Sequence, residues 1–251
     1  MNQADFRAAT PYATFGTVAI NASEDARRTF IRKTYTHLAA AIYAFVMLEW
    51  LFFSLGLQAP FMRMLAGQPM YWLLVIGAFV AVNWVADAWA RSATSIGMQY
   101  AGWFLTVIAW SVIFIPMLAI ANLLTINVQG LGTIGVIPAA AVSTVVMVAA
   151  LTAFVFLTRT DFSFMRGILA VSMFGAGALI LVSVFTGFQL GVWFSAAMII
   201  AACGYILYDT SNILHHYRTD QYVAASVALF ASVALLFWYV LRILMAFSNR
   251  D

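Results

Sequence analysis

The chain has 251 residues, of which 65% are hydrophobic and only 8% are charged, and its formal net charge is +3. Soluble domains carry about 25% charged residues, so this composition excludes a soluble globular protein and predicts an integral membrane protein. The basic residues lie at the ends of apolar segments, which indicates membrane topology and excludes a nucleic-acid-binding surface. The single cysteine, Cys203, allows no internal disulfide.

Residues 1–35 are polar, and we expect them to form an N-terminal tail on the cytoplasmic side. Asn21 is followed three positions later by Glu24, a spacing that resembles a capping box and predicts a short amphipathic helix beginning near Ala22. The first 34 residues contain no continuous apolar core. We therefore expect no cleavable leader of the signal-peptide type.

The remaining residues, 36–251, are predicted to form one transmembrane domain with seven apolar segments. A helix needs about 20 residues, at a rise of 1.5 Å each, to cross the hydrocarbon core of a bilayer. We place the spans at residues 36–57, 70–90, 99–122, 132–157, 164–186, 190–212 and 222–247, with short loops between them. The predicted fold class is therefore all-α, a polytopic integral membrane protein with seven transmembrane helices.

Lysine and arginine residues near the ends of the spans predict the orientation, because cytoplasmic loops carry an excess of them. With the tail inside, the inner side carries nine: Arg7, Arg27, Arg28, Arg32, Lys33, Arg91, Arg159, Arg166 and Arg218. The outer side carries at most three: Arg63, Arg242 and Arg250. We therefore expect a cytoplasmic N-terminus and an outer C-terminus, in a plasma (inner) membrane of the bacterial kind.

An acidic residue in the last turns of the sixth span is the first candidate for a functional site. An ionised side chain costs roughly 2.5–3.5 kcal/mol at the centre of a membrane helix, so it usually faces a protein interior or a water-filled path. The residues Tyr205, Asp209, Asn212 and His216 are separated by four, three and four positions and share one helix face. Either this face is functional, or Asp209 marks the membrane boundary and the residues after it form a solvated loop.

The second span carries a polar face at its predicted cytoplasmic end, at a depth similar to that of Asp209. Asn83, Asp87 and Arg91 follow one another at steps of four, and Asp87 and Arg91 form a natural i,i+4 pair. Either this face approaches Asp209, or it carries an interfacial ion pair that packing holds apart from Asp209.

Other ionisable residues in or near the spans leave two interpretations each. Glu49, well inside the first span, either lines a path or is protonated and hydrogen-bonded. Arg242 reaches Glu49 only if the first and seventh helices touch, and otherwise it extends toward the outer surface. His215 and His216 are neighbours, so they do not form a metal site on one helix face. His216 is either a pH sensor or a loop residue at the membrane surface, and Asp209 is the other pH-sensing candidate.

Motifs for common enzyme chemistry are absent from the sequence. It contains no Gly-rich phosphate loop, His-Glu-x-x-His, Gly-x-Ser-x-Gly or Cys-x-x-Cys. We therefore expect neither an enzyme nor a bound cofactor or metal.

Four blocks of the sequence resemble the Bax inhibitor-1 family of polytopic membrane proteins. They are residues 30–35 (FIRKTY), 154–164 (FVFLTRTDFSF), 205–216 (YILYDTSNILHH) and the segment from Ala228 to Leu244. The resemblance extends over most of the chain from about Phe30 onward. It implies a bundle of six helices around a central seventh, and a pH-sensitive calcium leak across the membrane.

The resemblance also implies a gate. In that family an aspartate in the sixth helix pairs with one in the seventh and closes the path on the cytoplasmic side. Asp209 matches the first aspartate, but Ser232 occupies the place of the second. Two carboxylates in one site compete for a proton, whereas a hydrogen bond from serine keeps Asp209 ionised. One hypothesis is that Asp87 replaces the missing acid, with Arg91 as the counter-charge that locks the closed state. Ser232 itself either belongs to a polar face of the seventh span, with Tyr239 and Arg242, or serves close helix packing.

Three functional hypotheses follow. The first is a leak for calcium or another cation, with Asp209 as the gate and with Asp87, Arg91, Asn83, Ser232, Asn212 and Glu49 along its path. The second is a non-conducting scaffold that modulates a membrane-protein partner, such as a membrane protease or a stress-response complex. The third is a small-solute or proton-coupled transporter, for which only Glu49 offers a site near the midplane. Each hypothesis places the chain in a lipid bilayer, and none requires nucleic acid.

Overall fold

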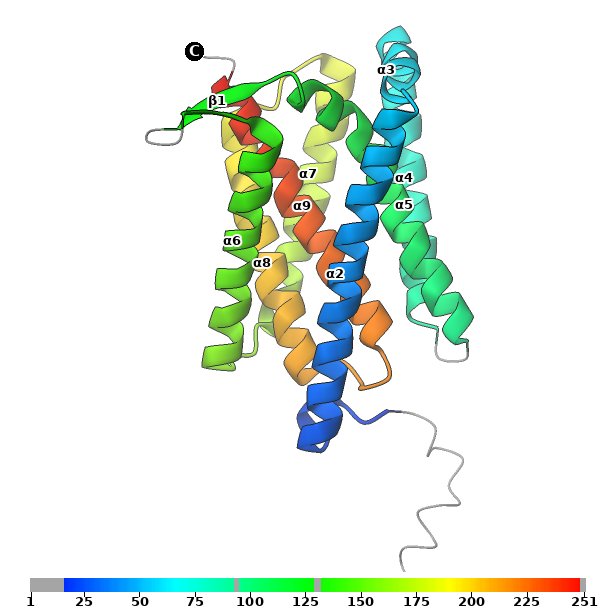
Figure 1. Ribbon diagram of the computed structural model, residues 1–251, viewed down its shortest axis with the longest axis vertical. Helices are drawn as coiled ribbons and strands as arrows, with labels where there is room; N and C mark the ends of the chain where they lie inside the picture. Colours follow the sequence, from blue (N-terminus) through cyan, green and yellow to red (C-terminus); the bar gives the residue numbers. More distant parts are fainter. Residues whose placement is uncertain (1–15, 93–94, 129–131, 249–251) are drawn as a thin grey trace, which may run out of the picture.

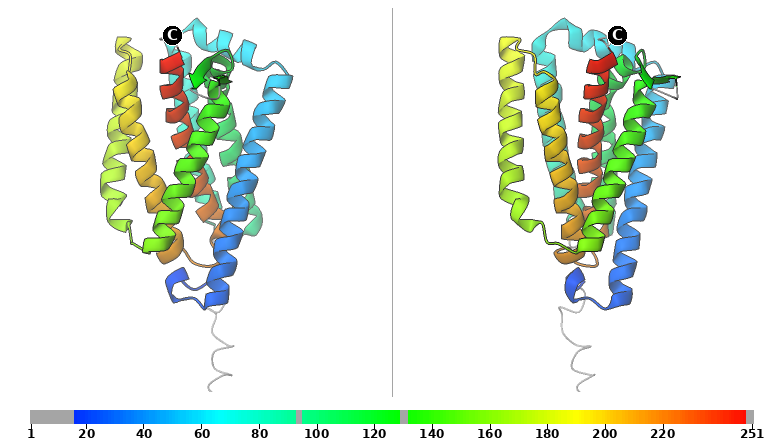
Figure 2. Two further views of the ribbon diagram at one scale, coloured as in Figure 1. Left: turned by 60° about the vertical axis from the view of Figure 1, so that its left-hand side comes forward. Right: turned by 90° about the vertical axis from the view of Figure 1, so that its left-hand side faces the viewer.

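The computed structural model describes residues 16–92, 95–128 and 132–248, most of which are helical. Seven helices of these residues are long and apolar enough to cross a membrane, and they form one elongated bundle (Figures 1 and 2). They are α2 (Glu24–Ser54), α4 (Pro69–Ala90), α5 (Ile96–Ala121), α6 (Val136–Thr158), α7 (Arg166–Thr186), α8 (Val192–His215) and α9 (Tyr222–Ser248). The prediction of an all-α protein with seven spans is confirmed.

The first transmembrane helix begins much earlier than its apolar residues predicted. α2 is one unbroken helix of 31 residues, so the predicted boundary between a tail and a membrane domain at residue 35 falls inside it. The Ser23 side chain caps the helix by accepting a hydrogen bond from the Ala26 N–H at 3.4 Å. The predicted cap at Asn21 is wrong, because Asn21 ends a separate 3₁₀ helix, η1 (Ala19–Asn21). Residues 1–15 of the predicted tail lie outside the described residues.

The segment before α2 packs against the loop between α8 and α9. The Ala19 N–H donates to the Tyr217 carbonyl oxygen at 2.9 Å, and Val18 forms an antiparallel bridge with Arg218. Ala19 is completely buried. The start of the described chain is therefore attached to the end of the bundle at which α8 ends and α9 begins.

Two elements at the other end of the bundle were not predicted. One is the helix α3 (Gln58–Gly67), and the other is a hairpin of β1 (Thr125–Val128) and β2 (Gly132–Gly135), which pair antiparallel. Both lie where α2 ends (Figure 1). The prediction that the fourth span begins at residue 132 is wrong, because residues 132–135 are a strand and the helix begins at Val136.

α9 is the central helix of the bundle, as the family resemblance implied. It contacts α2, α4, α5, α6 and α8, whereas α7 packs mainly on α8. Phe114 of α5 stacks on Phe237 with ring centroids 5.5 Å apart, and it meets Trp238 edge-on at 5.0 Å. Such aromatic contacts add to the stabilisation from apolar burial. They hold α9 against α5.

α4 and α5 approach each other closely at a glycine. Gly102 of α5 lies against the backbone of α4, and a Cβ atom at this position would come 2.5 Å from the Ala90 nitrogen. Small residues allow membrane helices to pack at short distances. This contact fixes the last turns of α4, which carry Asp87 and are followed by Arg91.

Candidate functional site: a buried acid between the last two helices

Asp209 lies in α8, six residues before the helix ends, and only 7% of the residue is exposed. Ser232 of α9, exposed to 6%, donates a hydrogen bond from its hydroxyl to Asp209 Oδ2 at 2.5 Å. The carboxylate is therefore enclosed between two helices and does not belong to a solvated loop. Because the helix continues past Asp209 to His215, the polar residues after it extend α8 beyond the predicted end of the span at residue 212.

The end of α4 brings a second acid and its counter-charge to the same region. Arg91 Nε donates to both carboxylate oxygens of Asp87, at 2.9 and 2.8 Å, and both side chains are about half exposed. Arg91 attracts the Asp209 carboxylate and Asp87 repels it, so the three charged groups lie within electrostatic range of one another. The structure thus brings the ion pair of α4 and the acid of α8 together.

Tyr217, in the loop after α8, completes this group and was missed by the sequence analysis. Its phenol is buried and interacts with the Arg91 side chain. Burial raises the pKa of Tyr217 to about 12, Arg91 opposes the shift, and the negative charges of Asp209 and Asp87 add to it. The phenol is therefore neutral at physiological pH. We call Asp209, Ser232, Asp87, Arg91 and Tyr217 the polar cluster.

His216 belongs to a separate contact, directly after the end of α8. Its Nε2 lies 3.0 Å from Asp161 Oδ2, in the connection between α6 and α7, and Ser211 donates to Asp161 Oδ1 at 3.3 Å. Slight burial would raise the pKa of Asp161, but hydrogen bonds from Ser163 and the contact with His216 outweigh it and lower the pKa to about 2. This contact ties the end of α8 to the α6–α7 connection.

The two predicted asparagines take part in local backbone interactions. The Asn83 amide donates to the Phe79 carbonyl oxygen within α4 at 2.9 Å. The Asn212 carbonyl oxygen accepts from the backbone N–H groups of His216 and Tyr217, at 2.8 and 2.9 Å, and so terminates α8. Neither residue adds a side-chain hydrogen bond to the polar cluster among the residues that the structure describes.

The predicted polar face of α8 contacts different neighbours along its length. The Tyr205 hydroxyl donates to the Leu169 carbonyl oxygen of α7 at 2.8 Å. Asp209 contacts Ser232 of α9, and His216 contacts Asp161. The shared face therefore joins α8 to three parts of the bundle and does not line a single site.

Glu49 lies in the opposite half of the bundle from Asp209, five residues before α2 ends. It is 7% exposed, and neither of its carboxylate oxygens has a hydrogen-bond partner within the described ranges. Arg242 is engaged elsewhere: its guanidinium donates to the Leu190 carbonyl oxygen at 2.7 Å and lies over the Phe194 ring. Helices α2 and α9 do touch, as a contact between Arg242 and Glu49 would require, but the guanidinium of Arg242 bonds to the α7–α8 connection.

The chemistry available at the polar cluster is that of oxygen donors and one guanidinium. Carboxylate, hydroxyl and phenol oxygens are ligands that hard cations accept, and the guanidinium is a permanent positive charge beside them. For the part of the chain that the structure describes, no group of three or more His, Cys, Asp or Glu side chains is arranged to hold a metal ion.

These features define a seven-helix membrane protein with a buried aspartate at the contact of its last two helices. A family model described as "Inhibitor of apoptosis-promoting Bax1" matches residues 27–249. The chain belongs to this Bax inhibitor-1 family, as the sequence blocks indicated.

Several relatives share parts of this sequence. The chain is 37% identical over 105 residues to Bax inhibitor 1 of Schizosaccharomyces pombe, which covers 41% of this chain and 39% of that protein. It is 31% identical over 147 residues to a BI1-like protein of Arabidopsis thaliana, covering 55% and 57%. It is 35% identical over 100 residues to YccA of Escherichia coli, a modulator of FtsH protease, covering 39% and 45%. The chain thus spans about half the length of these relatives.

Proposed function

We propose that this chain is a pH-sensitive leak for calcium or a similar cation, closed by the polar cluster. The observation that supports the proposal is the Asp209 carboxylate, buried between α8 and α9 and within range of Arg91. A carboxylate at such a depth is a natural contact for a permeating cation. The positive charge of Arg91 competes with a cation for Asp209, and it thereby favours the closed state.

Opening requires two changes at this end of the bundle. The hydrogen bond between Ser232 and Asp209 must break so that α8 and α9 separate, and the end of α4 must move Arg91 away from Asp209. The cation then replaces the guanidinium as the counter-charge of Asp209. From the other side of the bilayer, Glu49 is the first buried acid that a cation would meet.

The pH dependence has a different origin from the one that the family resemblance implied. Ser232 carries no carboxylate, so it cannot share a proton with Asp209 as a second aspartate would. The contact between His216 and Asp161 is an ion pair only when the imidazole is protonated. We assign the pH response to this pair, because it connects the end of α8 to the α6–α7 connection.

The test is calcium flux into proteoliposomes, measured from about pH 5 to pH 8, the range in which histidines titrate. Asp209→Asn removes the contact for the cation, and Asp87→Asn frees Arg91 to act on Asp209 alone. Both variants should therefore conduct severalfold less calcium than the unaltered protein. Asp25→Asn, an exposed acid in the first turn of α2, should not change the flux. Equal flux in all four proteins would remove this mechanism.

A second candidate function is the non-conducting modulator of a membrane protease. It is supported by the similarity to a protein named as a modulator of FtsH protease, and by the serine at the place of the second family aspartate. This candidate predicts that the chain co-purifies with an FtsH-type protease from native membranes and changes its rate of substrate degradation. It also predicts no calcium flux in proteoliposomes, so the two candidates are distinguished by one pair of measurements.

A further inference from the structure

Residues 16–19, which precede α2, lie along the loop between α8 and α9 (Figure 2). The Ala19 N–H donates to the Tyr217 carbonyl oxygen at 2.9 Å, and the Thr219 N–H donates to the Thr17 carbonyl oxygen at 3.0 Å. These two bonds flank one directly opposite pair of residues, as in an antiparallel β ladder. The segment is therefore bound to the loop through its backbone, and we call residues 16–19 the strap.

The strap fits the loop closely at Gly16. A Cβ atom at this position would come 2.7 Å from the Asp220 nitrogen and 2.8 Å from the Thr219 hydroxyl oxygen, whereas Cβ contacts shorter than 3.0 Å essentially do not occur. Arg218 donates to Asp220 Oδ2 at 2.7 Å, which holds the Asp220 carboxylate beside the glycine. A residue with a side chain would therefore push the strap and the loop apart.

The loop beneath the strap carries Tyr217, a member of the polar cluster. The phenol of Tyr217 is buried and interacts with Arg91, whose charge attracts Asp209. The connection from α8 to α9 is short, because it consists of residues 216–221. A change in the separation of α8 and α9 at this end must therefore move the loop, and the loop is bound to the strap.

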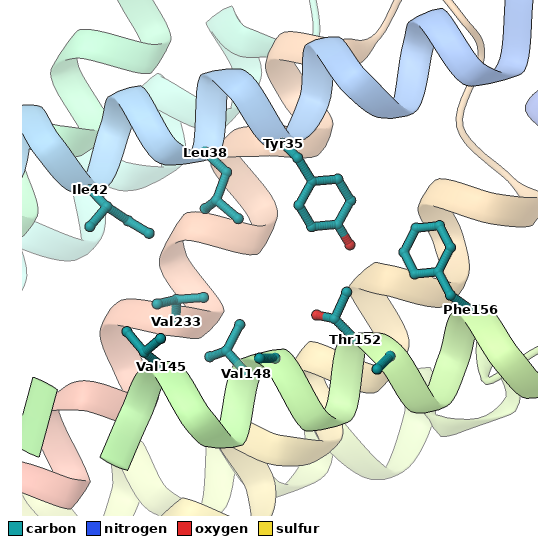
Figure 3. A pocket seen from close by; sticks show the side chains of 10 residues that line it. Tyr35, Leu38, Ile42, Val145, Val148, Thr152, Phe156 and Val233 are labelled. Atoms are coloured by element: carbon teal, nitrogen blue, oxygen red, sulfur yellow. The ribbon is translucent and has the colours of Figure 1, made fainter. Parts of the chain in front are cut away.

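The strap continues directly into the first transmembrane helix. It is followed by the rest of η1, by the buried Ala22 and by Ser23, which caps α2. Further along α2, an apolar crevice of about 490 Å³ separates this helix from α6, with Leu38 and Val148 on facing walls (Figure 3). The crevice leaves space for α2 to move relative to α6, and the strap limits that movement by joining the start of α2 to the α8–α9 loop.

We propose that the strap is an autoinhibitory contact, which must leave the α8–α9 loop before α8 and α9 can separate at the polar cluster. The inference rests on the proposed cation leak and adds a regulatory element to it. Segments held by a few backbone hydrogen bonds open locally while the rest of the fold stays intact, so the strap can detach without unfolding a helix. Because coupling between two sites is reciprocal, detaching the strap favours the open state, and the open state favours a detached strap.

Gly16→Val tests the first half of this coupling. The added side chain displaces the strap, so calcium flux in proteoliposomes should rise severalfold. Gly167→Val is the matched control, because a Cβ atom at this glycine of α7 meets no atom within 4 Å, and it should leave the flux unchanged. Equal flux in the two variants, in a preparation that conducts calcium, would overturn the proposal.

A disulfide between the strap and the loop should have the opposite effect. Val18 and Arg218 form the directly opposite pair between the two backbone bonds. The Cα atoms of such a pair are about 4.5 Å apart, which a disulfide can bridge. In a Cys203→Ala background, Val18→Cys with Arg218→Cys should lose flux severalfold on oxidation and regain it in reductant, with the bond verified by mass spectrometry. A folded variant that forms no disulfide, or a disulfide that leaves the flux unchanged, would contradict the proposal.

Hydrogen exchange measures the strap without calcium and so separates this proposal from the leak itself. The Ala19 N–H exchanges only when its bond to the loop opens. Arg91→Gln, which removes the charge beside Asp209, should speed this exchange severalfold in nanodiscs, whereas Arg166→Gln, at an exposed arginine of α7, should not. Absence of flux in every variant, with exchange still dependent on Arg91, would overturn the leak and keep the coupling. Flux without any change in exchange would overturn the strap.

Discussion

Ser232 of α9 donates a hydrogen bond of 2.5 Å to Asp209 of α8, at the position where the family resemblance implied a second aspartate. A hydroxyl donor stabilises the ionised carboxylate, whereas a second carboxylate would compete with it for a proton. The contact between the last two helices is therefore a hydrogen bond whose strength does not require a shared proton. One substitution is enough to test this distinction.

Ser232→Asp should convert this contact into a pH switch. Two carboxylates in one buried site cannot both be ionised without strong repulsion, so they share a proton at low pH and separate α8 from α9 at high pH. Calcium flux in proteoliposomes should then rise severalfold with increasing pH, beyond the trend of the unaltered protein. Ser232→Asn has nearly the same shape without the charge and is the control. Identical pH profiles for the two variants would contradict the interpretation.

Arg91→Gln should increase calcium flux severalfold with little loss of stability. The ion pair with Asp87 is about half exposed, and such pairs contribute at most about 1 kcal/mol to the free energy of unfolding. The loss of the positive charge near Asp209 instead removes the group that competes with a cation for this carboxylate, and it therefore favours the open state. Arg28→Gln breaks another i,i+4 pair, the exposed contact with Glu24 at 2.6 Å, and should leave the flux unchanged. Equal flux in the two variants would show that Arg91 does not hold the closed state.

Gly102→Ala should destabilise the contact between α4 and α5. The added methyl group would overlap the backbone of Ala86 and Ala90, which cannot rotate away, and overpacking of this kind typically costs about 1–3 kcal/mol. Gly177→Ala in α7 is the control, because a Cβ there meets no atom within 4 Å, and helix propensity favours alanine. Thermal unfolding in detergent should give a lower melting temperature for the first variant only. Equal melting temperatures would mean that the two helices can separate without cost.

Asp161→Asn should lower stability at neutral pH but not in strong acid. The pKa of Asp161 is lowered to about 2, so its ionised form stabilises the folded protein above the ordinary aspartate pKa near 4. This contribution is lost as the pH falls through about 2. Since the carboxylate is 43% exposed, we expect less than about 1 kcal/mol. Melting temperatures at about pH 7, 4 and 2 measure it, and a double-mutant cycle with His216→Gln isolates the pair. A difference that persists at pH 2 would contradict this assignment.

Hydropathy predicts the number and order of the membrane helices, because each apolar segment is long enough to span a bilayer and ends at polar residues. It does not predict the first twelve residues of α2. That part of the helix is polar on its outer side, and it is held by tertiary contacts that bury Phe30 and Thr34. The sequence analysis also assigned residues 132–135, which form a strand, to the fourth span. A short apolar run next to a helix has no hydrophobic periodicity that distinguishes a strand from a helix.

The sequence predicted the depth of the candidate site residues along their helices, but not how these residues are arranged around the bundle. Counting residues along α4 and α8 placed Asp87, Arg91 and Asp209 at a common depth, and the structure brings them within electrostatic range. Counting does not give the rotation of each helix or its neighbours. Tyr217 and Asp161 were missed for this reason: both lie in connections between helices, and their partners lie far away in the sequence.

The described chain enters the bundle beside η1 and leaves it at the end of α9, on opposite ends of the molecule (Figure 2). Seven crossings of a bilayer, which the length and apolarity of these helices indicate, would place the two ends of the described chain in different aqueous compartments. A kinase, protease or adaptor that acts on the segment before α2 cannot also reach Ser248 without crossing the bilayer. Any signal that must pass between the two extremities has to travel through the helices themselves.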